Sequence, residues 1–363
     1  MSFESGSISF RAFYVPKGLP EDVVSKFAKN ALPPVDAIGR DGAAGWVTGR
    51  HMLDRNITDD TARMAGYLRL CLVTAEKKVP DALLKAECKM EELAVMQAEG
   101  LSFIKRADRI RIRKDVMARL QPTMPPTLNG ISMVHDANRN MLYATATSDS
   151  KCDKFTLEFN RASGSEAVPV DVATAAKMRK DISVSNFGPG SFSPNVKDVD
   201  AVSDVGQDFL TWLWFYSEAK GGTIEIQGKS CAVAIGGPIT LLHEAEGAHV
   251  AVLKDGNPMM SSEIKPAMLS GKKLSKAKVT IARGEEMWET TFDAKRFTFG
   301  SLKMPKGDEK LDAVSAFQQR MVSLDTFMEI FLQFHDKFLA ERSDAEAWGK
   351  VKGDIVQWIL AKY

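Results

Sequence analysis

The spacing of apolar residues divides the chain into predicted strands and helices. Ile8–Val15 is rich in residues that favour strands, and Tyr67–Thr74 alternates as a half-buried strand does. Residues 20–32 and 80–100 each begin with proline and then place apolar residues three or four positions apart, which predicts two amphipathic helices. The first third of the chain is therefore expected to follow the order strand, helix, strand, helix.

The middle of the chain predicts antiparallel strands and further helices. Gly130–His135 and Met141–Thr147 flank a short polar turn, which is the pattern of a β-hairpin. Helices are predicted over Asp149–Arg161 and over about 205–219, and Lys278–Met304 has the alternation of β-hairpins. These elements predict an α+β fold, in which helices combine with antiparallel sheets in two or three subdomains.

The length and the turn residues suggest how the chain is divided. A chain of 363 residues exceeds what one hydrophobic core usually supports. Gly and Pro gather in residues 185–200, which form the best internal boundary. We expect an N-terminal α+β region over 1–184, a variable region over 185–250 with the aromatic helix 205–219, and a second basic β region with C-terminal helices over 251–363.

A wide apolar stripe predicts a long helix near the C-terminus. Its members lie three or four positions apart: Val314, Phe317, Met321, Leu324, Met328, Phe331, His335 and Phe338. Phe327 and Phe334 widen the stripe beyond a two-position coiled-coil seam. The width favours packing in the protein's own core, with a subunit interface as the alternative.

Composition predicts an ordinary globular protein of the cytoplasm. The apolar fraction is 44%, the N-terminus has no secretory signal pattern, and the densest apolar run is too short to span a bilayer. The four cysteines have no Cys-x-x-Cys spacing and are expected to be reduced and mostly buried.

The net charge of +1 hides a strongly basic segment, residues 105–117, with six positive and two negative charges. Over Arg109–Arg113, three arginines alternate with two isoleucines, so an extended backbone would place the guanidinium groups on one face. Guanidinium groups bind phosphate oxygens in a forked geometry, so the segment suits a polyanion, and nucleic acid is the first partner to test. The alternative is a solvated basic strand edge that prevents aggregation.

A second basic segment covers residues 254–306, with eleven basic and six acidic residues. Two basic segments on an otherwise acidic chain indicate a localised anion-binding surface. The predicted DNA-binding residues are Lys105, Arg106, Arg109, Arg111, Arg113, Lys114, Arg119, Lys272, Lys273, Lys276 and Lys278.

Other chemical patterns are weaker. His243–His249 groups histidine and glutamate without metalloprotease spacing, so an exposed turn is favoured over a metal site. Four aspartates between residues 198 and 208 could serve a magnesium-dependent nuclease, although acids at a helix start also complement the helix dipole. Trp212 and Trp214 could stack on bases, although helical packing is favoured.

The order of several short motifs resembles the RdgC family of bacterial recombination-associated proteins. Gly45–Val47 and the stretch Glu76–Gly164, which includes the basic segment, are similar to the N-terminal part of that family. A second match covers Ser262–Leu302, in the same order as in the family. Residues 185–250 and the tail beyond Ala340 have no clear counterpart in its shorter members.

The resemblance implies a nucleoid-associated protein that binds double-stranded DNA with little sequence preference. It also implies a homodimer that closes into a ring around DNA, acts in DNA recombination and restrains RecA activity. Residues Lys105–Lys114 match the basic lining of that ring, and Lys272 and Lys276 match it less closely. We expect a DNA-binding protein rather than an enzyme, with no catalytic residues and no cofactor. The alternatives are a metal-dependent nuclease acting on DNA and a protein-binding module.

Overall fold

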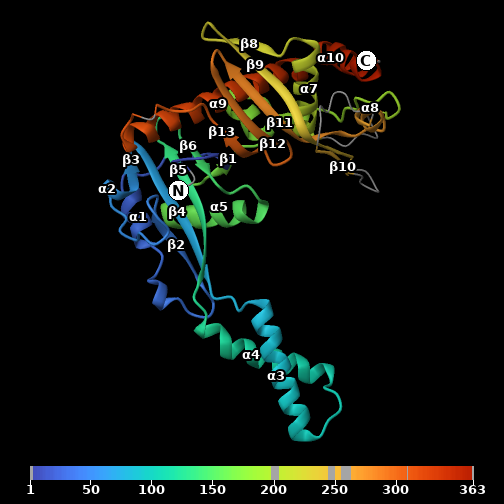
Figure 1. Ribbon diagram of the computed structural model, residues 1–363. Helices are drawn as coiled ribbons and strands as arrows, with labels where there is room; N and C mark the ends of the chain where they lie inside the picture. The colour runs from blue at the N-terminus through green and yellow to red at the C-terminus, as the bar shows by residue number, and fades with distance from the viewer. Residues whose placement is uncertain (1–2, 198–203, 244–249, 255–262, 309, 362–363) are drawn as a thin grey trace. The chain divides into compact units, whose positions relative to one another are not determined.

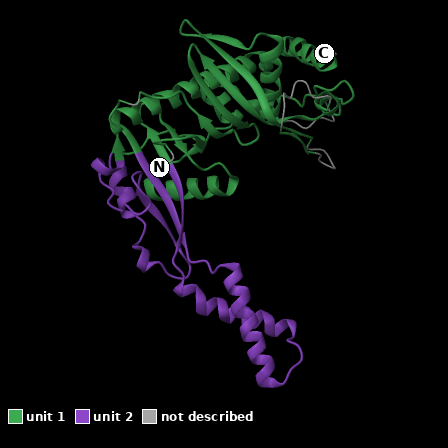
Figure 2. Ribbon diagram, in the orientation of Figure 1, with its two compact units in different colours: residues 1–20, 63–68, 133–363 green, residues 21–62, 69–132 purple. Residues whose placement is uncertain are grey.

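The computed structural model describes residues 3–197, 204–243, 250–254, 263–308 and 310–361 (Figure 1). It is a mixed α+β structure with a large antiparallel sheet, as predicted. The chain forms two compact units (Figure 2): unit 1 is residues 1–20, 63–68 and 133–363, and unit 2 is residues 21–62 and 69–132. The divisions expected near residues 184 and 250 do not coincide with these units, because strands distant in sequence pair with one another.

Unit 1 contains an antiparallel sheet with the strand order β10-β9-β11-β12-β13-β1-β6-β5. These strands are β1 (Ile8–Tyr14), β5 (Thr127–Asp136), β6 (Met141–Ala144), β9 (Lys229–Leu242), β10 (Val250–Leu253), β11 (Lys273–Arg283), β12 (Glu286–Asp293) and β13 (Thr298–Lys303), and the short strands β3 (Arg63–Met64), β7 (Val168–Pro169) and β8 (Thr223–Ile226) flank them. The predicted hairpin is confirmed, since Met133 of β5 pairs with Ala144 of β6. The N-terminal strand β1 lies between β13 and β6.

The helices of unit 1 are α5 (Asp149–Ser163), α6 (Val172–Lys180), the 3-10 helix η3 (Val184–Asn186), α7 (Val205–Ala219), α8 (Ile264–Leu269), α9 (Ala313–Ser343) and α10 (Ala345–Leu360). Helix α5 starts where the Ser148 side chain accepts a hydrogen bond from the Lys151 N–H, and it ends at Gly164 in the left-handed conformation. The predicted helices over 149–161 and 205–219 are therefore confirmed.

The apolar stripe of α9 lies in the core of unit 1. The Phe331 ring is fully buried, with its centroid 4.8 Å from that of Phe292, 4.9 Å from that of Phe299 and 5.6 Å from that of Phe209 on α7. The predicted core packing is confirmed for the buried members of the stripe, while Val314 at its start is exposed.

Unit 2 combines three adjacent strands, in the order β5-β4-β2, with helices. Its elements are α1 (Val23–Lys29), the 3-10 helix η1 (Val35–Ala37), β2 (Ala43–Thr48), α2 (Asp59–Ala62), most of β4 (Tyr67–Glu76), α3 (Asp81–Glu99), α4 (Arg106–Leu120), the 3-10 helix η2 (Gln121–Thr123) and the first part of β5. Trp46 on β2 is buried against Phe27, with ring centroids 4.7 Å apart. A Cβ atom at Gly45 would lie 2.5 Å from the Leu32 backbone, so only glycine allows this close approach.

The cysteines agree with the expectation from their spacing. All four cysteines are free, and Cys71, Cys152 and Cys231 are buried. Burial raises the pKa of the Cys71 thiol to about 11, so this thiol stays protonated at neutral pH. Across the residues that the structure describes, we find no helix with the length and apolarity needed to cross a membrane.

Candidate nucleic-acid interface

The strongly basic segment forms helix α4 and not the extended ribbon that the alternation over Arg109–Arg113 predicted. Ile112 and Val116 are buried, and Leu120 is half-buried. Their spacing of four residues is the helical period, and it outweighs an alternation that lasts only five residues. The prediction that three arginines share one face and two isoleucines the other is therefore wrong, because Ile112 is buried and Ile110 is exposed.

Helices α3 and α4 form a helical hairpin with its own small core. The buried members of this core are Leu84, Ile104, Ile112 and Val116. Helix α3 ends at Gly100, whose left-handed conformation (φ 65°) reverses the chain toward α4. Because α3 follows β4 and α4 precedes β5, the hairpin extends from one end of this strand pair (Figure 2).

Two hydrogen bonds fix the base of the hairpin within unit 2. The Lys77 Nζ donates to the Pro122 carbonyl oxygen (3.1 Å), and the Gln121 Nε2 donates to the Arg40 carbonyl oxygen (2.9 Å). The end of α4 is thereby connected to the segment that precedes α3 and to the segment that precedes β2.

One face of α4 carries cations that lack acidic partners. Arg106, Ile110, Arg113 and Lys114 follow the spacing that places residues on one helical face, opposite the buried Ile112. All four are exposed. Within the described part of the chain, neither these three cations nor the preceding Lys105 has an ion pair. We call Lys105, Arg106, Arg113 and Lys114 the unpaired cations.

The other three cations of α4 face carboxylates. Glu87, Glu91 and Glu92 on α3 and Asp108 on α4 lie within ion-pair distance of them, and the ion pairs are Arg109 Nε–Glu92 Oε1 (3.7 Å), Arg111 Nη2–Asp108 Oδ1 (3.2 Å), Arg119 Nη2–Glu87 Oε2 (2.9 Å) and Arg119 Nη2–Glu91 Oε2 (3.9 Å). The three arginine side chains are more than half exposed, so each pair contributes little to stability. The carboxylates nevertheless lower the positive potential around these arginines, and the unpaired cations are the stronger candidates for binding an anion.

Lys273 was predicted to bind DNA, and this prediction is wrong. Its side chain is buried in unit 1, 5% exposed, with Nζ 2.6 Å from Oδ1 of Asp208 on α7, which is 1% exposed. Its Nζ also lies 5.6 Å from the centroid of the Phe192 ring. Burial raises the pKa of the Asp208 carboxyl, while the Lys273 ammonium lowers it. A lysine at the start of β11 beside the first turn of α7 therefore serves the core and not the surface.

Two of the other three predicted DNA-binding lysines of the second basic segment pair with carboxylates. Lys276 Nζ lies 2.9 Å from Asp293 Oδ2, and Lys278 Nζ lies 2.6 Å from Glu289 Oε2. Lys272 is half-buried and has no acidic partner among the residues described. This segment therefore offers a weaker anion site than α4.

The residues considered for a nuclease or metal site lie partly outside the described structure, and Asp204, which lies inside it, has a structural role. The Asp204 Oδ1 accepts the Gln207 N–H at the start of α7 (3.0 Å), the capping role that acids at a helix start often have, while Asp198 and Asp200 lie outside the described residues. Residues 244–249, which include most of the predicted histidine and glutamate turn, also lie outside the described residues. No group of three or more His, Cys, Asp or Glu in the described ranges could hold a metal ion.

The two tryptophans considered for base stacking are core residues. Trp212 is fully buried, its ring stacks on Tyr216 with centroids 4.9 Å apart, and its Nε1–H donates to Glu341 Oε2 (2.8 Å). Trp214 is 2% exposed and donates to Glu218 Oε1 (3.1 Å). Helical packing is confirmed for both, and their rings have no face open to a base.

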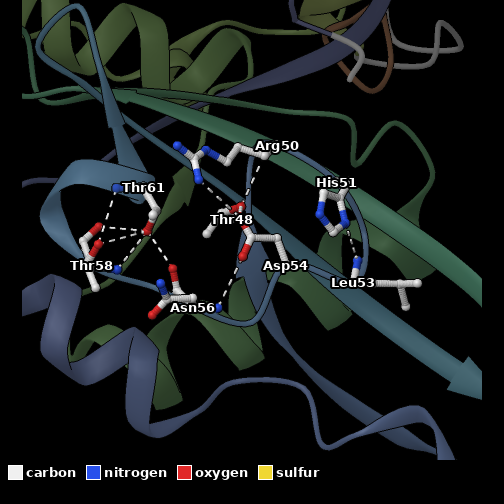
Figure 3. A network of polar contacts seen from close by, with 8 residues as sticks. All are labelled: Thr48, Arg50, His51, Leu53, Asp54, Asn56, Thr58 and Thr61. Atoms are coloured by element: carbon white, nitrogen blue, oxygen red, sulfur yellow. Dashed lines mark hydrogen bonds and ion pairs between the residues drawn. The ribbon is translucent and has the colours of Figure 1, made fainter.

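A second group of polar residues in unit 2 has a structural role (Figure 3). The Asp54 carboxylate accepts hydrogen bonds from the Thr48 hydroxyl (2.6 Å) and from the Asn56 N–H (3.3 Å). Thr61 donates its hydroxyl proton to the Asn56 carbonyl oxygen (2.5 Å), and it accepts the Thr58 N–H (2.8 Å). These contacts are local, and they hold the connection between β2 and α2.

A scan against protein-family models finds no match for this chain, and no curated protein matches it significantly in sequence. The resemblance to the RdgC family therefore stays a prediction from the ordered motifs.

Proposed function

We propose that this chain binds double-stranded DNA through its phosphate backbone, and that the unpaired cations of α4 form the contact surface. The observation that supports this most directly is the exposure of Lys105, Arg106, Arg113 and Lys114 without acidic partners among the described residues. Lysine and arginine neutralise phosphates and release counterions whatever the base sequence, so such a surface supplies affinity without specificity.

The helical conformation also bears on the competing interpretation of the basic segment. Charges that protect a strand edge are needed only where a strand has unpaired backbone groups, and α4 has none of the kind. A helical face with three unpaired cations around the exposed Ile110 supports the anion-binding interpretation.

The resemblance to RdgC extends the proposal to a homodimer that encircles DNA, associates with the nucleoid in the cytoplasm and restrains RecA during recombination.

An encircling dimer leaves a linear duplex by sliding off its end, but it must open to leave a circle. We expect a high-salt challenge to remove the protein faster from short linear duplex than from closed circles of the same sequence, and blocked ends should abolish the difference. Equal dissociation rates from circular and open-ended DNA would contradict encirclement and would leave only a protein that binds along the surface of the duplex.

The salt dependence of binding tests the α4 surface directly. Replacing Arg106, Arg113 and Lys114 together by Ala should reduce the slope of log affinity against log salt by about 2 to 3, at ~0.9 for each phosphate that is no longer neutralised. Affinity for unrelated duplexes should fall alike. Fluorescence anisotropy at several salt concentrations measures the slope, and circular dichroism confirms that the helix persists.

A control variant with the same change in net charge carries Arg109→Ala, Arg111→Ala and Arg119→Ala. Its slope should fall less, because these cations already face carboxylates. Equal slopes for the two variants would show that only net charge matters and would remove the unpaired cations as a defined surface.

Recovery of intact duplex after binding in magnesium buffer is expected, and cleavage would instead favour the nuclease alternative.

A further inference from the structure

The loop between α3 and α4 exposes an aromatic side chain next to unpaired cations. Phe103 is 64% exposed, and it is followed by the buried Ile104 and then by Lys105 and Arg106. Ile104 already supplies the contact between the loop and the hairpin core. Folding of the hairpin therefore leaves the Phe103 ring without a packing role.

The backbone on both sides of Phe103 is fixed. Gly100 adopts the left-handed conformation, and the Leu101 N–H donates to the Met96 carbonyl oxygen (2.9 Å), which closes the end of α3. On the other side, Ile104 is anchored in the hairpin core and α4 starts within two residues. The ring is thus held at the surface by a short, anchored loop, which lowers the entropy cost of bringing it against a ligand.

An exposed aromatic ring beside cations matches the chemistry of unpaired nucleobases. Every base has a flat face that stacks on an aromatic ring, and the phosphates on either side are neutralised by lysine and arginine. Bases inside a duplex have both faces covered by their neighbours. We propose that Phe103 stacks on an unpaired base of single-stranded nucleic acid while Lys105 and Arg106 contact the flanking phosphates. This inference rests on the proposed nucleic-acid binding and adds a preference for unpaired bases to it.

Charge complementarity favours this occupant over an apolar protein surface. An apolar partner that covered Phe103 would also bury Lys105 and Arg106, whose charges have no acidic partners in the described structure. Burying an uncompensated cation is costly, whereas phosphates compensate it. Nucleic acid satisfies both the ring and the cations.

The test compares three ligands with the full-length protein and its Phe103→Ala variant. Fluorescence anisotropy is measured with a 20-nucleotide oligo-dT, a 20-nucleotide oligo-rU and a duplex of about 20 base pairs. The variant should bind the single strands about 5- to 150-fold more weakly, the range expected when one base has no aromatic ring to stack on. Its duplex affinity and salt slope should stay as they are in the wild type. If the loss of affinity is larger for oligo-dT, the base comes from single-stranded DNA, and if it is larger for oligo-rU, the base comes from RNA.

Matched variants separate stacking from other contacts. Met90→Ala removes a side chain of similar exposure (63%) from α3 and should change none of the three affinities. Phe103→Leu keeps the apolar volume without an aromatic face and should bind the single strands as weakly as Phe103→Ala does. Phe103→Trp should bind them about as tightly as the wild type. Wild-type affinity of the Phe103→Leu variant for single strands, or an equal loss for duplex and single strands, would overturn the stacking proposal.

The outcomes also distinguish this inference from the proposed function. A wild-type protein that binds none of the three ligands would contradict both proposals. Binding of all three with no effect of Phe103→Ala would contradict only this inference. Conversion of a dimer into a monomer by Phe103→Ala, measured by sedimentation, would assign the loop to a second copy of the chain and overturn the base contact.

Discussion

Lys273→Met is expected to lower the free energy of unfolding by about 3 to 5 kcal/mol, the cost of removing one partner from a buried ion pair. The Asp208 carboxylate would stay buried beside α7 without the ammonium that now lies 2.6 Å away. Denaturant unfolding followed by circular dichroism measures the loss. Replacing Asp208 by Leu in the same chain should recover most of it, because the uncompensated charge is then gone.

A second lysine of the same strand provides the control. Lys276 also pairs with an aspartate, Asp293, but its side chain is 44% exposed. Asp293 keeps a second cation, Arg296, with Nη1 3.4 Å from Oδ2, so Lys276→Met should cost less than about 1 kcal/mol. A similar loss for the two variants would contradict a special role for the buried pair. The salt slope of DNA binding should be unchanged by Lys273→Met, since this side chain cannot reach a phosphate.

The pH dependence of the Lys273→Met loss gives an independent check. Burial already raises the pKa of Asp208, and removal of Lys273 takes away the charge that lowers it. A carboxyl whose pKa is raised in the folded state binds more protons there than in the unfolded chain, so stability falls as pH rises. The variant should therefore recover part of its loss, relative to the wild type, when the pH is lowered toward the pKa of Asp208.

Much of the fold could be predicted because its signals are local. Helix α5 has a serine cap at one end and a left-handed glycine at the other, and the β5–β6 hairpin has a polar turn between alternating strands. The partners of β1 could not be predicted in this way. Phe10 pairs with Phe299, and no local pattern encodes a contact over such a sequence distance. The two units were missed for the same reason.

The candidate site was predicted in part. The basic segment was identified from charge alone, but charge does not show which cations are paired. Arg109 and Arg119 face glutamates of α3, which becomes visible only when the register of the two helices is known. The period of Ile112, Val116 and Leu120 could have indicated a helix from the sequence. Lys273 could not have been excluded, because its partner Asp208 lies on a distant helix.

Acidification is expected to destabilise the protein steeply below pH 6.5, because two histidines are buried in the neutral form. Burial lowers the pKa of His335 to about 3 and that of His135 to about 4. Both values lie below ~6.5, the value in an unfolded chain, so the unfolded state binds more protons in between and stability falls with falling pH. Between its folded and unfolded pKa values, each histidine lowers the free energy of unfolding by up to about 1.4 kcal/mol for each unit by which the pH falls. Burial raises the pKa of Asp325, which opposes this loss near the acid end.

His335→Leu separates the contribution of one histidine. The ring is fully buried 5.1 Å from the Phe209 centroid, and neither of its nitrogens has a hydrogen-bond partner in the described part of the chain. A leucine of similar volume removes this unsatisfied polar group, so stability at pH 7.5 should rise by about 1 to 3 kcal/mol. Between pH 6.5 and 4.5 the variant should also lose about half as much stability as the wild type, because only His135 still takes up a proton on unfolding. Urea unfolding across this range measures both effects. An unchanged pH slope, whatever happens at pH 7.5, would show that His335 does not titrate between the folded and unfolded states.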